Sequence, residues 1–105
     1  MASRNEATLS RLNPGIDPEW TIVVAFYAGL HWIDAFLAHY GVHPANHGER
    51  TTKVLSLIKP ARRAYGFLRD HGAEARYETV TLPVSLALNC RDTWLPEVKQ
   101  HTKLP

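Results

Sequence analysis

The sequence lacks the features that define several common protein classes. Cys90 is the only cysteine among 105 residues, so a disulfide framework within the chain is excluded. Lysine and arginine number 12 against 10 aspartate and glutamate, and the resulting charge of +2 is lower than is usual in proteins dedicated to phosphate backbones. An apolar fraction of 45% with 21% charged residues excludes wholesale disorder. This length predicts one compact domain over residues 1–105.

Export and membrane signals are scarce as well. The first fifteen residues contain no apolar segment of the secretory type, and a single thiol suits a reducing compartment, so we expect a cytoplasmic protein. The only run that resembles a membrane span is Ile22–Leu37, which is short for that role and carries His31 and Asp34. We therefore expect a buried helix here and no membrane partner.

Helical periods account for most of the chain. Residues 2–12 form a short helix that Asn13-Pro14-Gly15 ends, and Asp17-Pro18-Glu19 is typical of a helix start, with Asp17 as its cap. The long central helix runs from about 18 to 40, where Gly41 supplies a left-handed stop. Further helices are predicted over 49–58, 60–77 and within 83–101, the last with a break or kink at Pro96.

These elements predict an all-α fold, a four- to five-helix up-and-down bundle. Glu78–Thr81 is a β-prone patch, but one short run cannot build a sheet. The central helix is apolar on nearly every face and has to be covered on more than one side. Because few helices remain in so short a chain, we expect a homodimer formed through this helix, with Trp32 and Trp94 as core or interface anchors.

Four segments of the sequence resemble a known family. They are Phe26-Tyr27-Ala28-Gly29-Leu30-His31-Trp32-Ile33-Asp34-Ala35-Phe36-Leu37-Ala38; then Gly41-Val42-His43-Pro44 with His47-Gly48-Glu49-Arg50; and Ala75-Arg76-Tyr77-Glu78. This string is similar to the HEPN superfamily, the helical domains named for higher eukaryotes and prokaryotes nucleotide-binding, over residues 20–78. The resemblance implies a helical bundle, commonly homodimeric. Many members are metal-independent RNases, often toxins paired with a small nucleotidyltransferase.

Those RNases carry an arginine followed, after four to six residues, by a histidine. None of the eight arginines here has a histidine at that distance; the nearest pair is Arg63 and His71, with seven residues between. The resemblance therefore implies a divergent, non-catalytic member: an interaction or RNA/nucleotide-binding module, with a nucleotidyltransferase-type protein as a candidate partner. The alternatives are an endoribonuclease with a divergent site, a metal-binding helical protein and a bare dimerisation scaffold.

The catalytic candidates for a divergent site are His31, Asp34, His47, Arg50 and Arg76. Tyr27, His31 and Asp34 lie four and three positions apart, on one helical face. Asp34 could orient His31 as a general base. It could instead form a structural ion pair with Arg50 or Arg76, because a buried carboxylate needs a cation. We favour the structural interpretation.

The sequence patterns that indicate metal-binding or phosphate-binding residues are weaker. His39, His43 and His47 recur every four residues, but Gly41 and Pro44 interrupt the helix, so solvated or capping histidines are favoured over a metal site and no cofactor is expected. The candidate RNA or nucleotide contacts are basic: Arg50, Arg62, Arg63 and Arg69. Tyr65 lies between them as in some nucleic-acid-binding surfaces, but it falls at a core position, which favours a solvated face. Cys90 is expected to be a small packed residue.

Overall fold

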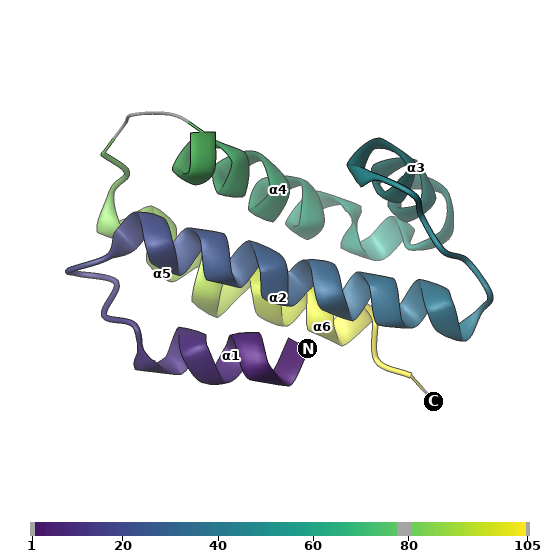
Figure 1. Ribbon diagram of the computed structural model, residues 1–105, viewed down its shortest axis with the longest axis horizontal. Helices are drawn as coiled ribbons and strands as arrows, with labels where there is room; N and C mark the ends of the chain where they lie inside the picture. Colours follow the sequence, from purple (N-terminus) through teal and green to yellow (C-terminus); the bar gives the residue numbers. More distant parts are fainter. Residues whose placement is uncertain (1, 78–80, 105) are drawn as a thin grey trace.

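The computed structural model describes residues 2–77 and 81–104 and is an all-α bundle, as predicted (Figure 1). The elements are α1 (Ala2–Arg11), α2 (Pro18–His39), α3 (His47–Leu57), the 3-10 turn η1 (Lys59–Ala61), α4 (Arg62–Tyr77), α5 (Val84–Asn89), the π-helical turn η2 (Cys90–Trp94) and α6 (Leu95–His101). No strand occurs in these two described ranges. Thr81 has irregular backbone, and the rest of the predicted β-prone patch, residues 78–80, lies outside them.

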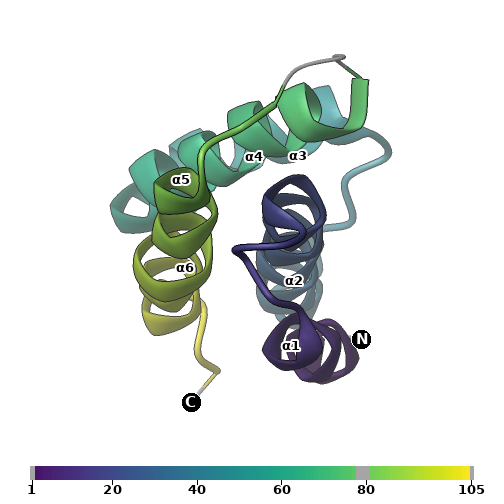
Figure 2. The same cartoon turned by 90° about the vertical axis from the view of Figure 1, so that its left-hand side faces the viewer.

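Four helical rods alternate in direction. Figure 1 shows α1, α2, α4 and the rod formed by α5, η2 and α6 running back and forth along the long axis, with α3 lying across one end. In Figure 2, α1 and α4 lie on opposite sides of α2, and the C-terminal rod runs beside it. The up-and-down arrangement expected from the sequence is therefore present within one chain.

The central helix α2 is covered by its own chain. Its buried residues are Thr21, Ile22, Val23, Val24, Ala25, Phe26, Ala28, Gly29, Leu30, Ile33 and Leu37. Helices α1, α4, α5 and α6, together with η2, all pack against it. The premise that too few helices remain to cover α2 is wrong, so this helix does not by itself require a second subunit. One face of α2 stays partly open, since Trp20 is 56% exposed and Tyr27 37%.

By length and composition alone, α2 is also a candidate membrane span. Within its most apolar window, however, 61% of the residues are buried by the rest of the bundle. The central helix of a globular bundle has the same composition, because it too must be apolar on several sides.

The ends of α2 were predicted correctly, but one capping detail was not. The Asp17 side chain makes no capping hydrogen bond; its backbone carbonyl instead accepts from the Thr21 amide at 3.0 Å and the Thr21 hydroxyl at 2.9 Å. At the other end Gly41 has φ +78°, the left-handed conformation that glycine adopts at little cost.

Helices α2 and α4 approach closely at glycines. A Cβ atom on Gly72 would lie 2.9 Å from Cβ and Cγ of Phe26, and one on Gly29 would lie 2.9 Å from Leu68 Cδ1. Gly66 is different, because a Cβ there would meet nothing within 4 Å. The close contact between the two helices therefore depends on Gly29 and Gly72.

The C-terminal rod is interrupted before Pro96, not at it. Pro96 is near the start of α6, and the irregularity is the π turn η2, in which the Leu95 amide donates to the Cys90 carbonyl. Proline lacks an amide hydrogen, so residue 96 cannot make the ordinary helical bond to the carbonyl four residues earlier. The helix departs from regular α geometry in the turn that precedes the proline, where it forms the wider π turn.

Candidate functional site

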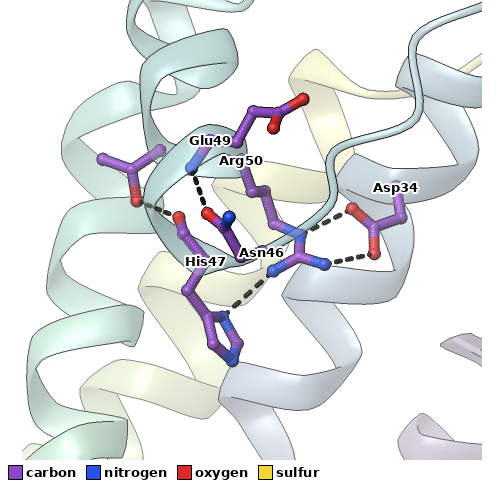
Figure 3. A network of polar contacts seen from close by, with 6 residues as sticks. Asp34, Asn46, His47, Glu49 and Arg50 are labelled. Atoms are coloured by element: carbon purple, nitrogen blue, oxygen red, sulfur yellow. Dashed lines mark hydrogen bonds and ion pairs between the residues drawn. The ribbon is translucent and has the colours of Figure 1, made fainter.

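An ion pair joins α2 to α3 near the start of α3 (Figure 3). Arg50 Nε donates to Asp34 Oδ1 at 2.7 Å and Arg50 Nη2 to Asp34 Oδ2 at 3.1 Å, a bidentate geometry. The two side chains are 12% and 34% exposed, respectively. Of the two cations predicted for Asp34, Arg50 and Arg76, the structure pairs it with Arg50.

The helix start that positions Arg50 is set by Asn46. Its side chain accepts a hydrogen bond from the Glu49 amide at 2.8 Å, the usual role of an N-cap (Figure 3). The expectation of a capping histidine is wrong at His47, because His47 is the first residue of α3. An Asn cap fixes the first turn, and Arg50 at the end of that turn then points toward α2.

His47 is held by the same arginine. Arg50 Nη1 lies 3.0 Å from His47 Nδ1 (Figure 3). A guanidinium only donates, so Nδ1 must accept, and the proton of the neutral imidazole is then on Nε2. In this arrangement His47 has no free lone pair with which to act as a general base.

The hydrogen bond that an oriented His31 base requires is not formed. Both carboxylate oxygens of Asp34 are engaged by Arg50, and no hydrogen bond joins Asp34 to His31 within the described ranges. His31 is partly buried on α2. The spacing of four and three residues thus places these side chains on one face without bringing them into a catalytic pair.

Arg76, near the end of α4, lies among aromatic rings. Its guanidinium carbon is 4.8, 5.4 and 4.9 Å from the ring centroids of Phe26, Tyr27 and Tyr77, and Nη1 donates to the Tyr27 hydroxyl at 3.1 Å. Arg76 Nε is buried and has no hydrogen-bond partner. In the part of the chain that the structure describes, no carboxylate pairs with Arg76, so the aromatic faces supply its contacts.

Tyr65 is a core residue with an unusual hydroxyl. The side chain is 1% exposed, and its hydroxyl makes no hydrogen bond. Burial raises the pKa of this phenol, and the guanidinium groups of Arg50 and Arg69 act in the opposite direction. Arg69 itself binds the Thr51 hydroxyl at 3.2 Å and pairs with Asp70 at 3.0 Å. The prediction that Tyr65 lies in the core is correct, and it cannot stack on a nucleobase.

Arg62 and Arg63 are exposed at the start of α4, as predicted. Two aromatic side chains, Phe67 and Trp94, lie beside Arg63, and neither contact was predicted from the sequence. The two rings stack at 4.5 Å, and the Arg63 guanidinium carbon is 5.8 Å from each centroid. Phe67 follows Arg63 by four residues, a spacing that places both on one helical face and that the sequence already contains.

The candidate metal ligands do not converge. His39, His43 and His47 are all exposed, and no group of three potential ligands occurs within residues 2–77 and 81–104. Cys90 is buried, and burial raises the pKa of its thiol to about 12. As expected, Cys90 is a packed residue, with 0% of its surface exposed, and a thiol with so high a pKa is a poor nucleophile.

A polar cluster on the other side of α2 was not predicted. Glu6 of α1 accepts from Trp32 Nε1 at 3.1 Å and forms an ion pair with Lys99 of α6. The Lys99 ammonium also lies 5.4 Å from the Trp32 ring centroid. No short spacing links these residues, so only the packed rods bring them together.

Comparison with known protein families, with curated proteins and with solved structures finds no match for this chain. Its function therefore has to be inferred from the geometry of the chain itself.

Proposed function

We propose that this chain is a non-catalytic, HEPN-like helical module that binds a phosphate-bearing ligand, RNA or a nucleotide, through arginine side chains of α4. The supporting observation is Arg76, whose buried Nε has no partner and whose contacts are with aromatic rings. Within the described residues no carboxylate neutralises this guanidinium, so its charge can act on an incoming phosphate, and Tyr77, which is 78% exposed, offers a ring on which a base can stack.

The other arginines differ in whether a carboxylate of the chain already pairs with them or leaves them free to contact a phosphate. Arg62, Arg69 and Arg76 follow one another at intervals of seven, so they lie along one face of α4. Arg62 is exposed, whereas Arg69 is engaged by Asp70, and Arg50 by Asp34. We therefore assign Arg62 and Arg76 to direct phosphate contacts, with Arg63 beside Phe67 as a further candidate, and give Arg50 the structural function of holding α3 on α2.

A homodimer, a nucleotidyltransferase-type partner and a toxin–antitoxin setting in the cytoplasm belong to the same proposal, as implications of the family resemblance. Cleavage of RNA is the alternative. Two features favour binding over cleavage: the Arg50 donor occupies His47 Nδ1, and Asp34 is fully paired.

The test is fluorescence anisotropy with a labelled single-stranded RNA at several salt concentrations. We expect binding that weakens steeply with salt, because phosphate contacts release counterions. Arg76→Gln should weaken binding severalfold and reduce the slope of log K against log salt by about 0.7, the value for one contact on a single strand. Arg11→Gln, which removes the same charge from an exposed position on α1, is the matched control.

The same samples, run on a denaturing gel with and without divalent metal, should contain intact RNA. Cleavage that disappears in His47→Ala would instead favour the endoribonuclease alternative. Absence of RNA and nucleotide binding at low salt would contradict the proposal and leave the dimerisation scaffold.

A further inference from the structure

A concave site lies at the end of α2, beside α3. It is a cavity of about 380 Å³ lined by Phe36, Leu37, Tyr40, Val42 and Leu57. None of these residues belongs to the arginine cluster of α3 and α4. The cavity is therefore a separate feature, and its occupancy is independent of the proposed RNA or nucleotide binding.

The walls of this cavity are fixed by the backbone. Gly41, with its positive φ, reverses the chain after α2, and the Val42 amide then donates to the Leu37 carbonyl at 2.9 Å. The rings of Phe36 and Tyr40, one helical turn apart, lie 5.1 Å from each other. Because a turn and a helix hold the lining in place, the site is preformed, as small-molecule sites usually are.

The lining is apolar and incompletely covered. Leu37 at its floor is 1% exposed, whereas Tyr40 is 59% exposed and Leu57 54%. Small-molecule sites have volumes of about 300–1,000 Å³, and this cavity lies in the lower part of that range. A protein partner would need roughly 800 Å² of surface, far more than five side chains provide. The size thus favours one small molecule with an apolar body.

Most ionisable side chains next to the lining residues along the chain are basic; the acidic one, Asp34, is two positions before Phe36 and is paired with Arg50. The His39 ring meets the Tyr40 ring edge-on at 4.9 Å, and His43 and Lys59 follow the lining residues Val42 and Leu57 by one and two positions. No aspartate or glutamate occurs in residues 35–48 or 51–69. Apart from Asp34, which Arg50 neutralises, and Glu49, eight positions before Leu57, the ionisable groups close to the lining along the chain are thus imidazole and ammonium groups.

We propose that this cavity binds a small apolar carboxylic acid. Its aliphatic or aromatic body packs on Leu37 between Tyr40 and Leu57, and its carboxylate lies at the rim, on the side of His39, His43 and Lys59. The apolar lining selects the body of the ligand, and the surplus of basic over unpaired acidic side chains beside the lining selects the sign of the head group.

The experiment compares three probes of equal chain length, octanoate, octanol and octylammonium, titrated into the full chain at neutral pH. Amide shifts in two-dimensional NMR report the affinity and the position. We expect saturable octanoate binding with shifts at Val42 and Leu57, and octylammonium at least tenfold weaker. Leu57→Gln should weaken octanoate at least tenfold, while Leu88→Gln, which changes a 38% exposed leucine on α5, leaves it unchanged.

A variant that combines His43→Gln with Lys59→Gln should bring octanoate down toward the affinity of octanol, and Arg76→Gln should leave octanoate binding unchanged. Equal affinity for octanoate and octylammonium would overturn the proposal, as would binding that Leu57→Gln does not affect. If no probe binds, the proposal is also wrong; sedimentation then asks whether a second copy covers the cavity, in which case Leu57→Gln converts a dimer into monomers.

Discussion

The two sides of α2 both carry polar side chains between helices, but they are built differently. On the side of α1 and α6, Glu6 accepts from Trp32 and pairs with Lys99, and these groups find their partners within the bundle. On the side of α3 and α4, the Tyr65 hydroxyl and Arg76 Nε are buried without a hydrogen bond. An unsatisfied buried polar group costs about 1–3 kcal/mol. The polar groups on the first side are paired with one another, whereas the second side keeps two buried polar atoms without a hydrogen-bond partner.

Among substitutions on the two sides of α2, Asp34→Ala, on the α3 side, has the largest expected effect. It leaves Arg50, only 12% exposed, without its carboxylate. Removing one partner of a buried pair costs about 3–5 kcal/mol, and the partial exposure of Asp34 favours the lower end, about 3 kcal/mol. Urea unfolding measures it. Asp70→Ala, in the exposed pair with Arg69, should cost little, and equal losses in the two variants would contradict a special role for the Asp34 pair.

A smaller effect is expected at the α2–α4 contact. Gly72→Ala places a methyl group against Cβ and Cγ of Phe26, atoms that cannot move independently of α2. Overpacking costs about 1–3 kcal/mol, and the 2.9 Å approach to Phe26 Cβ favours the upper end; subtracting about 1 kcal/mol for the better helix propensity of alanine leaves a net loss of about 2 kcal/mol. Gly66→Ala, in open space on the same helix, should stabilise by about 1 kcal/mol. Two changes of the same sign in thermal unfolding would refute this account of the packing.

The smallest of these effects belongs to the α1 side. Glu6→Gln removes the charge that pairs with Lys99 but keeps an oxygen that can accept from Trp32 Nε1. These side chains are one-quarter to one-third exposed, so we expect a loss of about 1 kcal/mol. Hydrogen exchange should accelerate in the amides of α1 and stay unchanged in α4. Uniform acceleration across both helices would mean that α1 is not held separately by this cluster.

The sequence predicted those parts of the structure that depend on neighbours along the chain. The bounds of α2 followed from Pro18 and Gly41, and the all-α class followed from the helical periods. Asp34 was placed on a face of α2, and Arg50 was one of two partners considered. Which of Arg50 and Arg76 pairs with Asp34 depends on how α3 and α4 pack against α2. A pattern of neighbouring residues does not predict that packing.

Two kinds of feature could not be predicted from the sequence: contacts between residues far apart along the chain, and the exact position of irregular turns within a helix. Glu6 and Lys99 are 93 positions apart, so their contact exists only after the rods have packed. The apolar coverage of α2 was misjudged for a related reason: short helices such as α1 and α6 each cover a side of it. Pro96 signalled an irregularity, but a proline disturbs the preceding turn, and the sequence does not say how the chain absorbs it.

The π turn has a consequence for the length of the chain. The core positions of the C-terminal rod are Ala87 and Cys90, then Leu95 and Val98, and the gap of five between Cys90 and Leu95 is too long for a regular helix to keep both on one face. The wider turn takes up that additional residue, so the same stripe faces α2 before and after it. The rod thus accommodates one extra residue, and the apolar face of its second half still points into the core. At this turn a residue can be added to the chain without changing which side of the rod is apolar.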